Sequence, residues 1–369
     1  MNNEYFDFLC KFYNKEFVID LLKSINENKT NCLRLNLNKN FNIDKYNLTK
    51  HKYVENAYYY DNSLNSFGKY IYHDIGCYYI QDPSAMMVVK ILNPNKNDLI
   101  LDVCAAPGGK TTQAALLTNN LVYCNDSNFS RALDLVENIE RIGLDNCIVL
   151  NTDFTKSLDS LYSKFDKVIL DAPCSGEGMF RKNNEVENDW SIDKVNKLIP
   201  IQKQLILNAY KCLKKNGIMT YSTCTFNKLE NEEIVQYLLD NTNASLINIE
   251  YYDDVDHSDT LKETIHLFPN HFNGEGHYIA LIKSNDEYEE KNSFIKSNID
   301  NKKYQIYKEF EKNNLISKYP INNLYIDKDN LYYFKDNIIS IKKTNYLKYG
   351  LYLGSFNKNI FTPSHHLGS

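Results

Sequence analysis

Residues 98–112 read Asp98-Leu-Ile-Leu-Asp-Val-Cys-Ala-Ala-Pro-Gly-Gly-Lys-Thr-Thr112, an apolar run followed by a turn that contains two glycines. The apolar run predicts a buried strand, and the turn leads into a stretch that predicts a helix. A strand, a glycine-containing turn and a helix in this order place backbone N–H groups and a helix N-terminus beside a ligand. The segment therefore predicts an α/β fold that binds a nucleotide-type ligand.

Short apolar runs alternate with helical stretches from about residue 75 to residue 284. This alternation is typical of a parallel sheet covered by helices, so we expect a doubly wound, Rossmann-like sheet of seven strands. The expected strands are 99–103, 121–125, 148–151, 167–171, 218–222, 245–250 and 278–282. The expected helices are 111–118, 130–142, 194–213 and 229–240.

Two smaller modules are expected to flank this domain, which we place at residues 71–285. Residues 1–70 combine amphipathic stretches with an alternating run, a pattern that predicts a small α+β module. Residues 286–301 are charged and lack periodicity, so they predict a linker. Residues 302–369 are rich in Tyr and Lys and contain short β-like runs, which predicts a small β-rich domain.

The chain of 369 residues has 47 acidic and 42 basic side chains, a net charge of -5 that at first argues against nucleic-acid binding. The charge is unevenly distributed, at about +2 over residues 1–70, -14 over 71–290 and +7 over 291–369. The basic flanks can therefore supply phosphate contacts. No apolar run is long enough to span a bilayer and no signal peptide is apparent, so a cytoplasmic protein without membrane association is expected.

The turn at 104–111 also approaches the Walker pattern, because Gly109, Lys110 and Thr111 match it. However, Cys104 replaces the first glycine of that pattern, and Pro107 removes one N–H from the loop that would cradle phosphates. A P-loop ATPase therefore remains an alternative.

Acidic residues at the ends of the next three expected strands favour a different ligand, because the carboxyl ends of parallel strands converge on one pocket. Their carboxylates suit the ribose hydroxyls, adenine amine and cationic sulfonium of S-adenosylmethionine. These acids are Asp126, Asp153 and Asp171.

Two of the nine cysteines lie in polar turns at strand ends, Cys174 in Asp171-Ala-Pro-Cys-Ser-Gly-Glu-Gly178 and Cys224 in Tyr221-Ser-Thr-Cys-Thr-Phe226. Structural cysteines normally lie within apolar elements. The chemistry that needs a thiol beside S-adenosylmethionine is pyrimidine C5 methylation, because a thiolate that adds to C6 makes C5 nucleophilic. Asp171 is placed to bridge N3 and the exocyclic amine of cytosine. No Cys-x-x-Cys pair is present, so we expect no zinc site.

Short motifs that together resemble one protein family are spread over most of the chain. They are Tyr79-Ile-Gln-Asp-Pro-Ser-Ala-Met86, Cys104-Ala-Ala-Pro-Gly-Gly-Lys110, Asp171-Ala-Pro-Cys-Ser-Gly-Glu-Gly-Met-Phe-Arg-Lys182, Tyr221-Ser-Thr-Cys-Thr225 with Glu230-Asn-Glu232, Gly274-Glu-Gly-His-Tyr278 and Thr362-Pro-Ser-His-His-Leu367. In this combination the chain resembles the NOL1/NOP2/Sun (RsmB/NOP) family of RNA 5-methylcytosine methyltransferases, and most closely its bacterial RsmF-like branch, which modifies small-subunit rRNA.

The resemblance implies a class I methyltransferase domain whose last strand is antiparallel. It implies that Cys224 is the nucleophile, that Cys174 assists release of the product, and that Asp171 faces the base. It also implies that S-adenosylmethionine is held by Cys104, Ala105, Ala106, Pro107, Gly108, Gly109, Lys110, Asp126, Arg131, Asp153 and Asp171.

The same resemblance implies RNA as the partner, with 16S rRNA as the target, and RNA-binding roles for both flanking modules. The C-terminal module is expected to be PUA-like and is short for the branch. A tRNA cytosine-C5 methyltransferase is the alternative within this class of enzyme. A P-loop ATPase and a catalytically silent RNA-binding ribosome assembly factor are the alternatives outside it. We expect a monomer.

Overall fold

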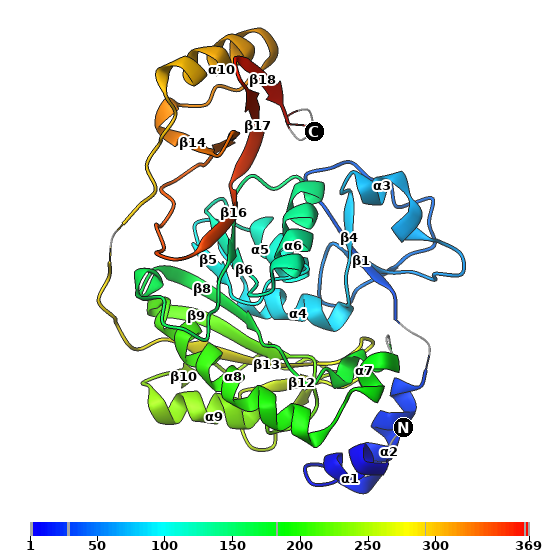
Figure 1. Ribbon diagram of the computed structural model, residues 1–369. Coiled ribbons are helices and arrows are strands. Elements are labelled where there is room, and N and C mark those ends of the chain that lie inside the picture. The colour runs from blue at the N-terminus through cyan, green and yellow to red at the C-terminus, as the bar shows by residue number, and fades with distance from the viewer. Residues whose placement is uncertain (1–2, 28–29, 182–183, 292, 365–366, 368–369) are drawn as a thin grey trace.

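The computed structural model describes residues 3–27, 30–181, 184–291, 293–364 and 367. Lys182, His365 and His366, which belong to motifs quoted above, lie outside the described residues. A large mixed sheet forms the centre of the molecule, with an N-terminal and a C-terminal module at its periphery (Figure 1).

The core of this sheet is parallel and has the strand order β9-β8-β5-β6-β7. β13 then pairs with β9 in the antiparallel direction. This topology confirms the predicted doubly wound, Rossmann-like sheet and its antiparallel last strand. The strand bounds are β5 (Ile100–Asp102), β6 (Val122–Asn125), β7 (Cys147–Asn151), β8 (Phe165–Asp171), β9 (Leu213–Thr223) and β13 (His277–Lys283).

The predicted number of seven strands was wrong, because the described part of the sheet has ten. β12 (Ile265–Leu267) and β11 (Asp256–His257) extend the edge beyond β13, and β16 (Asn345–Tyr349) pairs with β7 at the opposite edge. The expected strand 245–250 is reduced to β10 (Ser245–Leu246), which also pairs with β13. Strands of two or three residues are too short to show alternation in a sequence.

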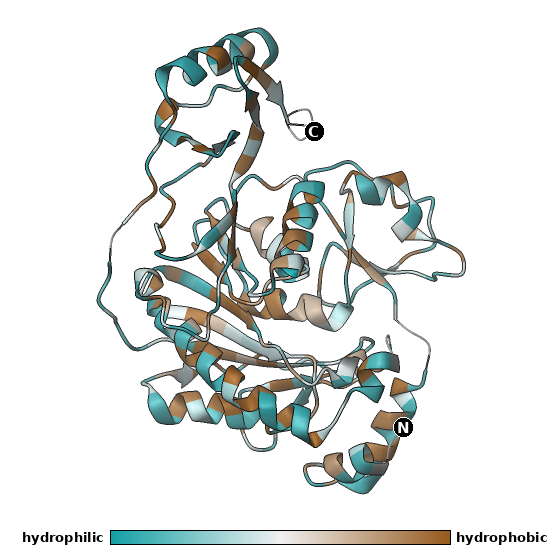
Figure 2. Cartoon of the chain, in the orientation of Figure 1, coloured by the Kyte–Doolittle hydropathy of each residue, from teal (hydrophilic) through white to brown (hydrophobic). Residues whose placement is uncertain are grey.

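Helices cover both faces of the sheet (Figure 1). Side chains alternate between the faces along each strand, so that Ile100 packs in one hydrophobic cluster and Leu101 in the other. Figure 2 shows hydrophobic and hydrophilic residues alternating along these helices, as expected for helices with one buried face. One face is covered by α4 (Pro83–Leu92), α5 (Gly109–Ala115) and α6 (Phe129–Ile142), the other by α8 (Ile192–Lys211) and α9 (Glu232–Asn241).

α4 begins within the motif at residues 79–86 and is not among the helices that the sequence predicts. Its N-cap is Asp82, whose side chain accepts a hydrogen bond from the Ala85 N–H, and Pro83 occupies the first turn. Nearly all of its residues are buried, so they lack the alternation of apolar and polar positions by which a surface helix is recognised.

The N-terminal segment forms an antiparallel sheet with the order β2-β3-β1-β4 and two helices that pack around Trp190. The bounds are α1 (Asn3–Leu9), α2 (Lys15–Ile25), β1 (Cys32–Leu35), β2 (Thr49–Lys50), β3 (Ala57–Tyr59), α3 (Ile71–Asp74) and β4 (Tyr78–Ile80). The short helix α7 (Asn184–Asn188) lies in the loop between β8 and α8.

The C-terminal segment contains a helix and a second small antiparallel sheet with the order β14-β15-β17-β18. Its β16, however, belongs to the central sheet, and Ile338 and Ile339 pack in the same hydrophobic cluster as the sheet. The backbone N–H of Ile339 donates to the hydroxyl of Tyr123 in β6 at 2.8 Å. The bounds are α10 (Asn301–Asn314), β14 (Leu324–Asp327), β15 (Asn330–Tyr333), β17 (Leu351–Asn357) and β18 (Ile360–Pro363).

The contact between Tyr123 and Ile339 yields a first prediction. Tyr123→Phe leaves the buried N–H of Ile339 without its acceptor, which costs about 1–3 kcal/mol. Urea denaturation should therefore show a lower free energy of unfolding. Tyr251→Phe is the matched control, because Tyr251 is exposed. Equal stability of the Tyr123 variant and the wild type would show that the C-terminal segment does not depend on this contact.

Candidate active site

The loop between β5 and α5 is held through its carbonyl groups. Arg131 Nη2 donates to the carbonyl of Ala106 at 2.7 Å. Asn138 Nδ2 donates to the carbonyl of Pro107 at 3.0 Å, and the hydroxyl of Tyr79 donates to the same oxygen at 3.4 Å. Side chains of α6 and β4 therefore set the shape of the loop.

Two glycines let neighbouring elements approach this loop closely. Gly108 has a φ of +110°, and a Cβ there would lie 3.0 Å from the side chain of Leu135. At Gly109, a Cβ would lie 3.2 Å from the side chain of Gln81. On the same side, Arg34 of β1 donates from Nη2 to Thr112 Oγ1 at 2.9 Å and to the carbonyl of Gly109 at 3.3 Å. The buried guanidinium thus fastens the N-terminal sheet to the first turn of α5.

The strand-end acids lie on one side of the loop, as the parallel topology predicts. Asp126 is buried, accepts a hydrogen bond from the Asn128 N–H at 2.9 Å, and lies 3.5 Å from Arg131 Nη1. Asp153 is more exposed and accepts hydrogen bonds from Thr155, which lower its pKa. Both acids and Arg131 line a cavity of about 550 Å³, together with Asp171.

A second cavity of about 290 Å³ lies on the other side of the loop and is lined by Asp171, Lys110, Cys224 and His277. The two cavities meet at a common wall, so a group bound in one can reach a group bound in the other. The residues shared by both linings are Cys104, Ala106, Asp171, Met179 and Cys224.

The structure brings most of the predicted cofactor residues to one of the two cavities. Gly108 lines neither, because it packs against Leu135. The larger cavity is lined by Asp126, Arg131 and Asp153, and the smaller by Ala105, Pro107, Gly109 and Lys110. Both cavities are lined by Cys104, Ala106 and Asp171.

Asp171 is the charged centre of the site. Its Oδ2 lies 2.7 Å from Lys110 Nζ, and its Oδ1 accepts a hydrogen bond from Ser222 Oγ at 2.7 Å and lies 3.6 Å from His277 Nε2. Burial acts to raise the pKa of Asp171, but the neighbouring Lys110 ammonium outweighs it and holds this pKa well below its usual range. Asp171 is therefore a carboxylate, and a hydrogen-bond acceptor, at neutral pH.

The two predicted thiols lie side by side. Cys174 Sγ and Cys224 Sγ are 3.4 Å apart, and both residues are partly buried. The hydrogen bond to Cys224, and then burial, raise the pKa of Cys174 well above its ordinary value. Cys174 therefore keeps its proton at neutral pH and can donate it in a hydrogen bond to the sulfur of Cys224.

Two buried carboxylates connect the thiol loops. Next to Cys174, Ser175 donates its backbone N–H to Glu230 Oε1 at 2.9 Å. Downstream of Cys224, the side chain of Asn227 donates to Glu177 Oε1 and to Glu230 Oε2, both at 2.7 Å. Burial and the charge of Glu230 raise the pKa of Glu177. These bonds fix the positions of the two loops relative to each other.

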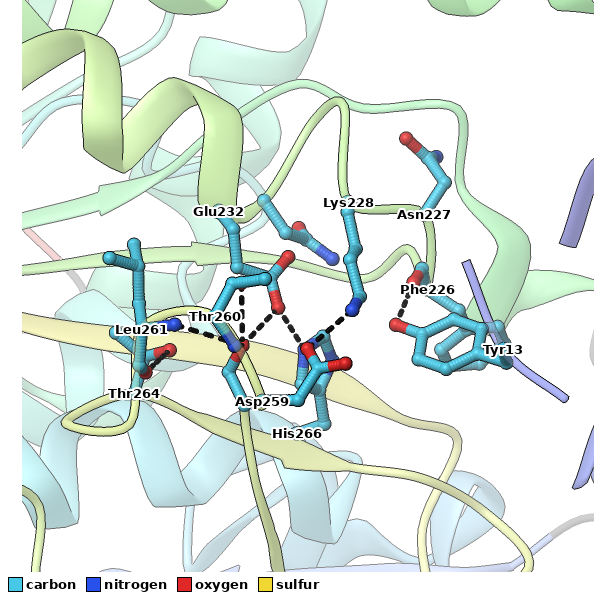
Figure 3. A network of polar contacts seen from close by, with 12 residues as sticks. Tyr13, Phe226, Asn227, Lys228, Glu232, Asp259, Thr260, Leu261, Thr264 and His266 are labelled. Atoms are coloured by element: carbon cyan, nitrogen blue, oxygen red, sulfur yellow. Dashed lines mark hydrogen bonds and ion pairs between the residues drawn. The ribbon is translucent and has the colours of Figure 1, made fainter. Parts of the chain in front are cut away.

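A further polar network lies behind the loop that follows β9 (Figure 3). Glu232 accepts hydrogen bonds from His266 Nε2 of β12 and from Ser258 Oγ, both at 2.7 Å. The hydroxyl of Tyr13, between α1 and α2, donates to the carbonyl of Phe226 at 2.7 Å. The N-terminal helices and the sheet edge therefore both support the loop downstream of Cys224.

Sequence reasoning assigned no individual role to several residues around Asp171 and the thiols. Ser222 could have been found, because it ends the expected strand 218–222 and therefore lies at the same carboxyl edge of the sheet as Asp171. His277, Glu177 and Glu230 lie in quoted motifs, but nothing in the sequence shows that they are buried at the site. Within the described ranges, no group of three or more His, Cys, Asp or Glu side chains is arranged to hold a metal ion.

Comparison with known protein families identifies the class. Residues 89–283 match the 16S rRNA methyltransferase RsmB/F family, and residues 309–369 match the first C-terminal domain of RsmF rRNA methyltransferases. The fold, the two cavities and this match define an S-adenosylmethionine-dependent RNA methyltransferase. The chain belongs to the RsmB/F family. Among its described residues, no helix is both long and apolar enough to cross a membrane.

The individual relatives include both rRNA and tRNA methyltransferases. The chain is 36% identical to a tRNA (cytosine(49)-C(5))-methyltransferase of Pyrococcus abyssi, over 65% of this chain and 81% of the relative. It is 37% identical to ribosomal RNA small subunit methyltransferase F of Vibrio vulnificus, over 60% of this chain and 49% of the relative. The match thus spans about half the length of the methyltransferase F relative.

Solved structures share the fold. A methyltransferase homolog from Pyrococcus horikoshii has a TM-score of 0.64 and 25% identity, over 75% of this chain and 93% of that one. The structure of NSun6 from the same organism with SFG, an S-adenosylmethionine analogue, has a TM-score of 0.70 and 19% identity, over 78% of this chain and 99% of that one.

The carboxylate link between the thiol loops leads to a second prediction. Each carboxylate oxygen of Glu230 accepts hydrogen bonds from protein donors. In Glu230→Gln the amide NH₂ group would replace one of these oxygens and face those donors, which lowers the free energy of unfolding by about 2 kcal/mol or more. We expect a lower free energy of unfolding in urea and faster reaction of the thiols with a disulfide reagent. Glu233→Gln, at an exposed position of α9, is the control. Unchanged stability and thiol reactivity would contradict the linking role.

Asp102 at the end of β5 gives a prediction for pH. Burial raises the pKa of Asp102 to about 7, although a hydrogen bond from Thr111 lowers it in part. Between its unfolded pKa of roughly 4 and about 7 the folded protein holds a proton that the unfolded chain releases, so stability falls as pH rises through this window, by roughly 4 kcal/mol at most. Asp102→Asn should remove this part of the pH dependence in urea titrations at pH 5 and pH 8. An unchanged dependence would contradict the raised pKa.

Proposed function

We propose that the chain catalyses S-adenosylmethionine-dependent methylation of cytosine C5 in RNA, with small-subunit 16S rRNA as the target. The observation that carries the proposal is the pair of thiols, 3.4 Å apart, beside the carboxylate of Asp171 at the common wall of two cavities. A cofactor in one cavity and a base in the other would meet at Cys224.

The larger cavity fits S-adenosylmethionine by its donor set. Asp126 and Asp153 offer carboxylate oxygens suited to the ribose hydroxyls and the adenine amine, and Arg131 holds the loop between β5 and α5 through the carbonyl of Ala106. When bound, the cofactor supplies an electrophilic methyl group.

Cys224 acts as the nucleophile in this proposal. Its thiolate forms a bond to C6 of the base, and the electron pair of the C5–C6 double bond moves so that C5 becomes nucleophilic. The hydrogen bond from the protonated Cys174 stabilises the thiolate of Cys224 before the attack.

Asp171 and Lys110 hold the base during this addition. The carboxylate of Asp171 accepts a hydrogen bond from the exocyclic amine of cytosine. The ammonium of Lys110, 2.7 Å from Asp171, is the cationic donor that can face the ring edge and stabilise the electron density displaced onto it. Asp171 thus acts as an acceptor, because its low pKa keeps it ionised.

Cys174 assists release. After C5 carries the new methyl group, its proton must leave, and the electron pair restores the C5–C6 double bond and expels the thiolate of Cys224. The hydrogen bond to Cys224, the largest contribution to the raised pKa of Cys174, weakens once that sulfur is bonded to carbon. In this proposal Cys174 then gives up its proton to solvent, and its thiolate takes the proton from C5.

The choice of 16S rRNA rests on the RsmB/F match and on the match of residues 309–369 to a domain of RsmF enzymes. A tRNA target is the second candidate, because the Pyrococcus abyssi relative is a tRNA cytosine-C5 methyltransferase. The net charge of about +7 over residues 291–369 supplies phosphate contacts in either case. Both targets would place the reaction in the cytoplasm.

The proposed nucleophile predicts how two thiol variants differ. Cys224→Ala should lower tritium transfer from labelled S-adenosylmethionine into 16S rRNA by about 10³-fold or more, because the addition step is lost. Cys174→Ala should instead accumulate a covalent protein–RNA adduct, visible as a slow band on a denaturing gel. Cys212→Ala, at a buried cysteine outside both cavities, is the control.

The result also separates the alternatives. Methylation that persists in Cys224→Ala would overturn the nucleophile assignment, and a Cys174→Ala variant that turns over without an adduct would overturn the release role. Transfer into tRNA but not into 16S rRNA would change the target. RNA binding without transfer would favour an assembly factor, and tight ATP binding without transfer a P-loop enzyme.

A further inference from the structure

His277 begins β13 and has no part in the proposed mechanism, yet it is buried in the wall of the smaller cavity. Its Nε2 lies 3.6 Å from Asp171 Oδ1, too far for a hydrogen bond, and forms no hydrogen bond within the described part of the chain. Its Nδ1 lies 3.2 Å from Ser84 Oγ of α4. The ring therefore has one occupied and one available nitrogen.

The partners of Ser84 decide which nitrogen carries the proton. Ser84 has a single hydroxyl proton, which it donates to Asp82 Oδ1. Asp82 is an acceptor there, because its two oxygens also accept the backbone N–H groups of Ala85 at 3.1 Å and Glu275 at 3.0 Å. Ser84 Oγ also accepts the backbone N–H of Gly276 at 3.2 Å. With its only proton committed, Ser84 can act only as an acceptor toward His277.

Nδ1 of His277 must therefore be the protonated nitrogen. In the neutral ring, Nε2 then carries a lone pair and is an acceptor. This lone pair faces the same cavity as the carboxylate of Asp171, which is also an acceptor. Two neighbouring hydrogen-bond acceptors in a largely buried cavity wall are satisfied by a ligand that donates a hydrogen bond to each.

Building on the proposed cytosine-C5 activity, we propose that His277 is a specificity-determining residue that selects cytosine over uracil. The exocyclic amine of cytosine has two N–H donors, one for Asp171 Oδ1 and one for His277 Nε2. Uracil has a carbonyl oxygen at this position, which is an acceptor and would face the lone pair of Nε2. Asp171 alone discriminates less, because it can accept the N3–H of uracil instead.

Trapping on fluorinated RNA measures this selectivity without knowledge of the target position. Fluorine at C5 replaces the proton that must leave, so the covalent adduct with Cys224 persists after methyl transfer. Transcripts of 16S rRNA and of tRNA are made with 5-fluorocytidine in place of cytidine, or with 5-fluorouridine in place of uridine. The rate of adduct formation with S-adenosylmethionine is then compared between the two bases on denaturing gels.

His277→Leu should lower the cytidine-to-uridine ratio of trapping rates by about tenfold or more, because one amine contact is lost and the repulsion toward uracil is removed. His277→Gln places an amide oxygen near the position of Nε2 and should keep most of the ratio. Ser84→Ala should lower the ratio although His277 remains, because Nδ1 is no longer fixed as the donor. His271→Leu, at an exposed histidine outside both cavities, should leave the ratio unchanged.

The outcomes separate the inference from the proposed function. Wild-type protein that traps 5-fluorocytidine RNA while His277→Leu slows both bases equally would overturn the selectivity role and leave the proposed activity standing. A ratio lost equally in the Leu and Gln variants would assign a purely structural role. Wild-type protein that traps neither RNA, in 16S rRNA or in tRNA, would overturn the proposed function and this inference together.

Discussion

The ion pair between Lys110 Nζ and Asp171 Oδ2, at 2.7 Å, is the contact on which the rest of the site depends. Lys110 lies in the first turn of α5 and Asp171 at the end of β8, so the pair joins the cofactor loop to the strand that leads to Cys174. It also keeps a largely buried carboxylate ionised, which burial alone would oppose. Without this cation the pKa of Asp171 would rise, and the strongest acceptor in the wall between the two cavities would be weakened.

The parallel topology explains why the sequence predicts so much of the site. Asp126, Asp153 and Asp171 follow consecutive strands, and the carboxyl ends of parallel strands share one edge, so local pattern is sufficient to bring these acids together. Cys174 and Cys224 follow from the same rule. The second cavity, which Asp171 also lines, does not follow, because it depends on how the loop at 103–108 is held by side chains of α6 and β4.

Contacts between distant segments account for what the sequence could not predict. β16 pairs with β7 although nearly two hundred residues separate them. The sequence pattern of β16 does not distinguish it from the other strands of the C-terminal segment. The tautomer of His277 depends on α4, β13 and the loop before β13. Such pairings arise from tertiary packing, and a single sequence carries no periodic signal for them.

The embedding of β16 also changes how the basic C-terminal segment can act on RNA. A module on a free linker would search the RNA independently, and its contribution would depend on linker length. Here Tyr123 accepts the backbone N–H of Ile339, and β16 completes the sheet edge beside β7, the strand that ends two residues before Asp153. The small C-terminal sheet is therefore held in a fixed position relative to the cofactor cavity. Phosphate contacts made by this segment would thus orient the RNA relative to Cys224 as well as increase affinity.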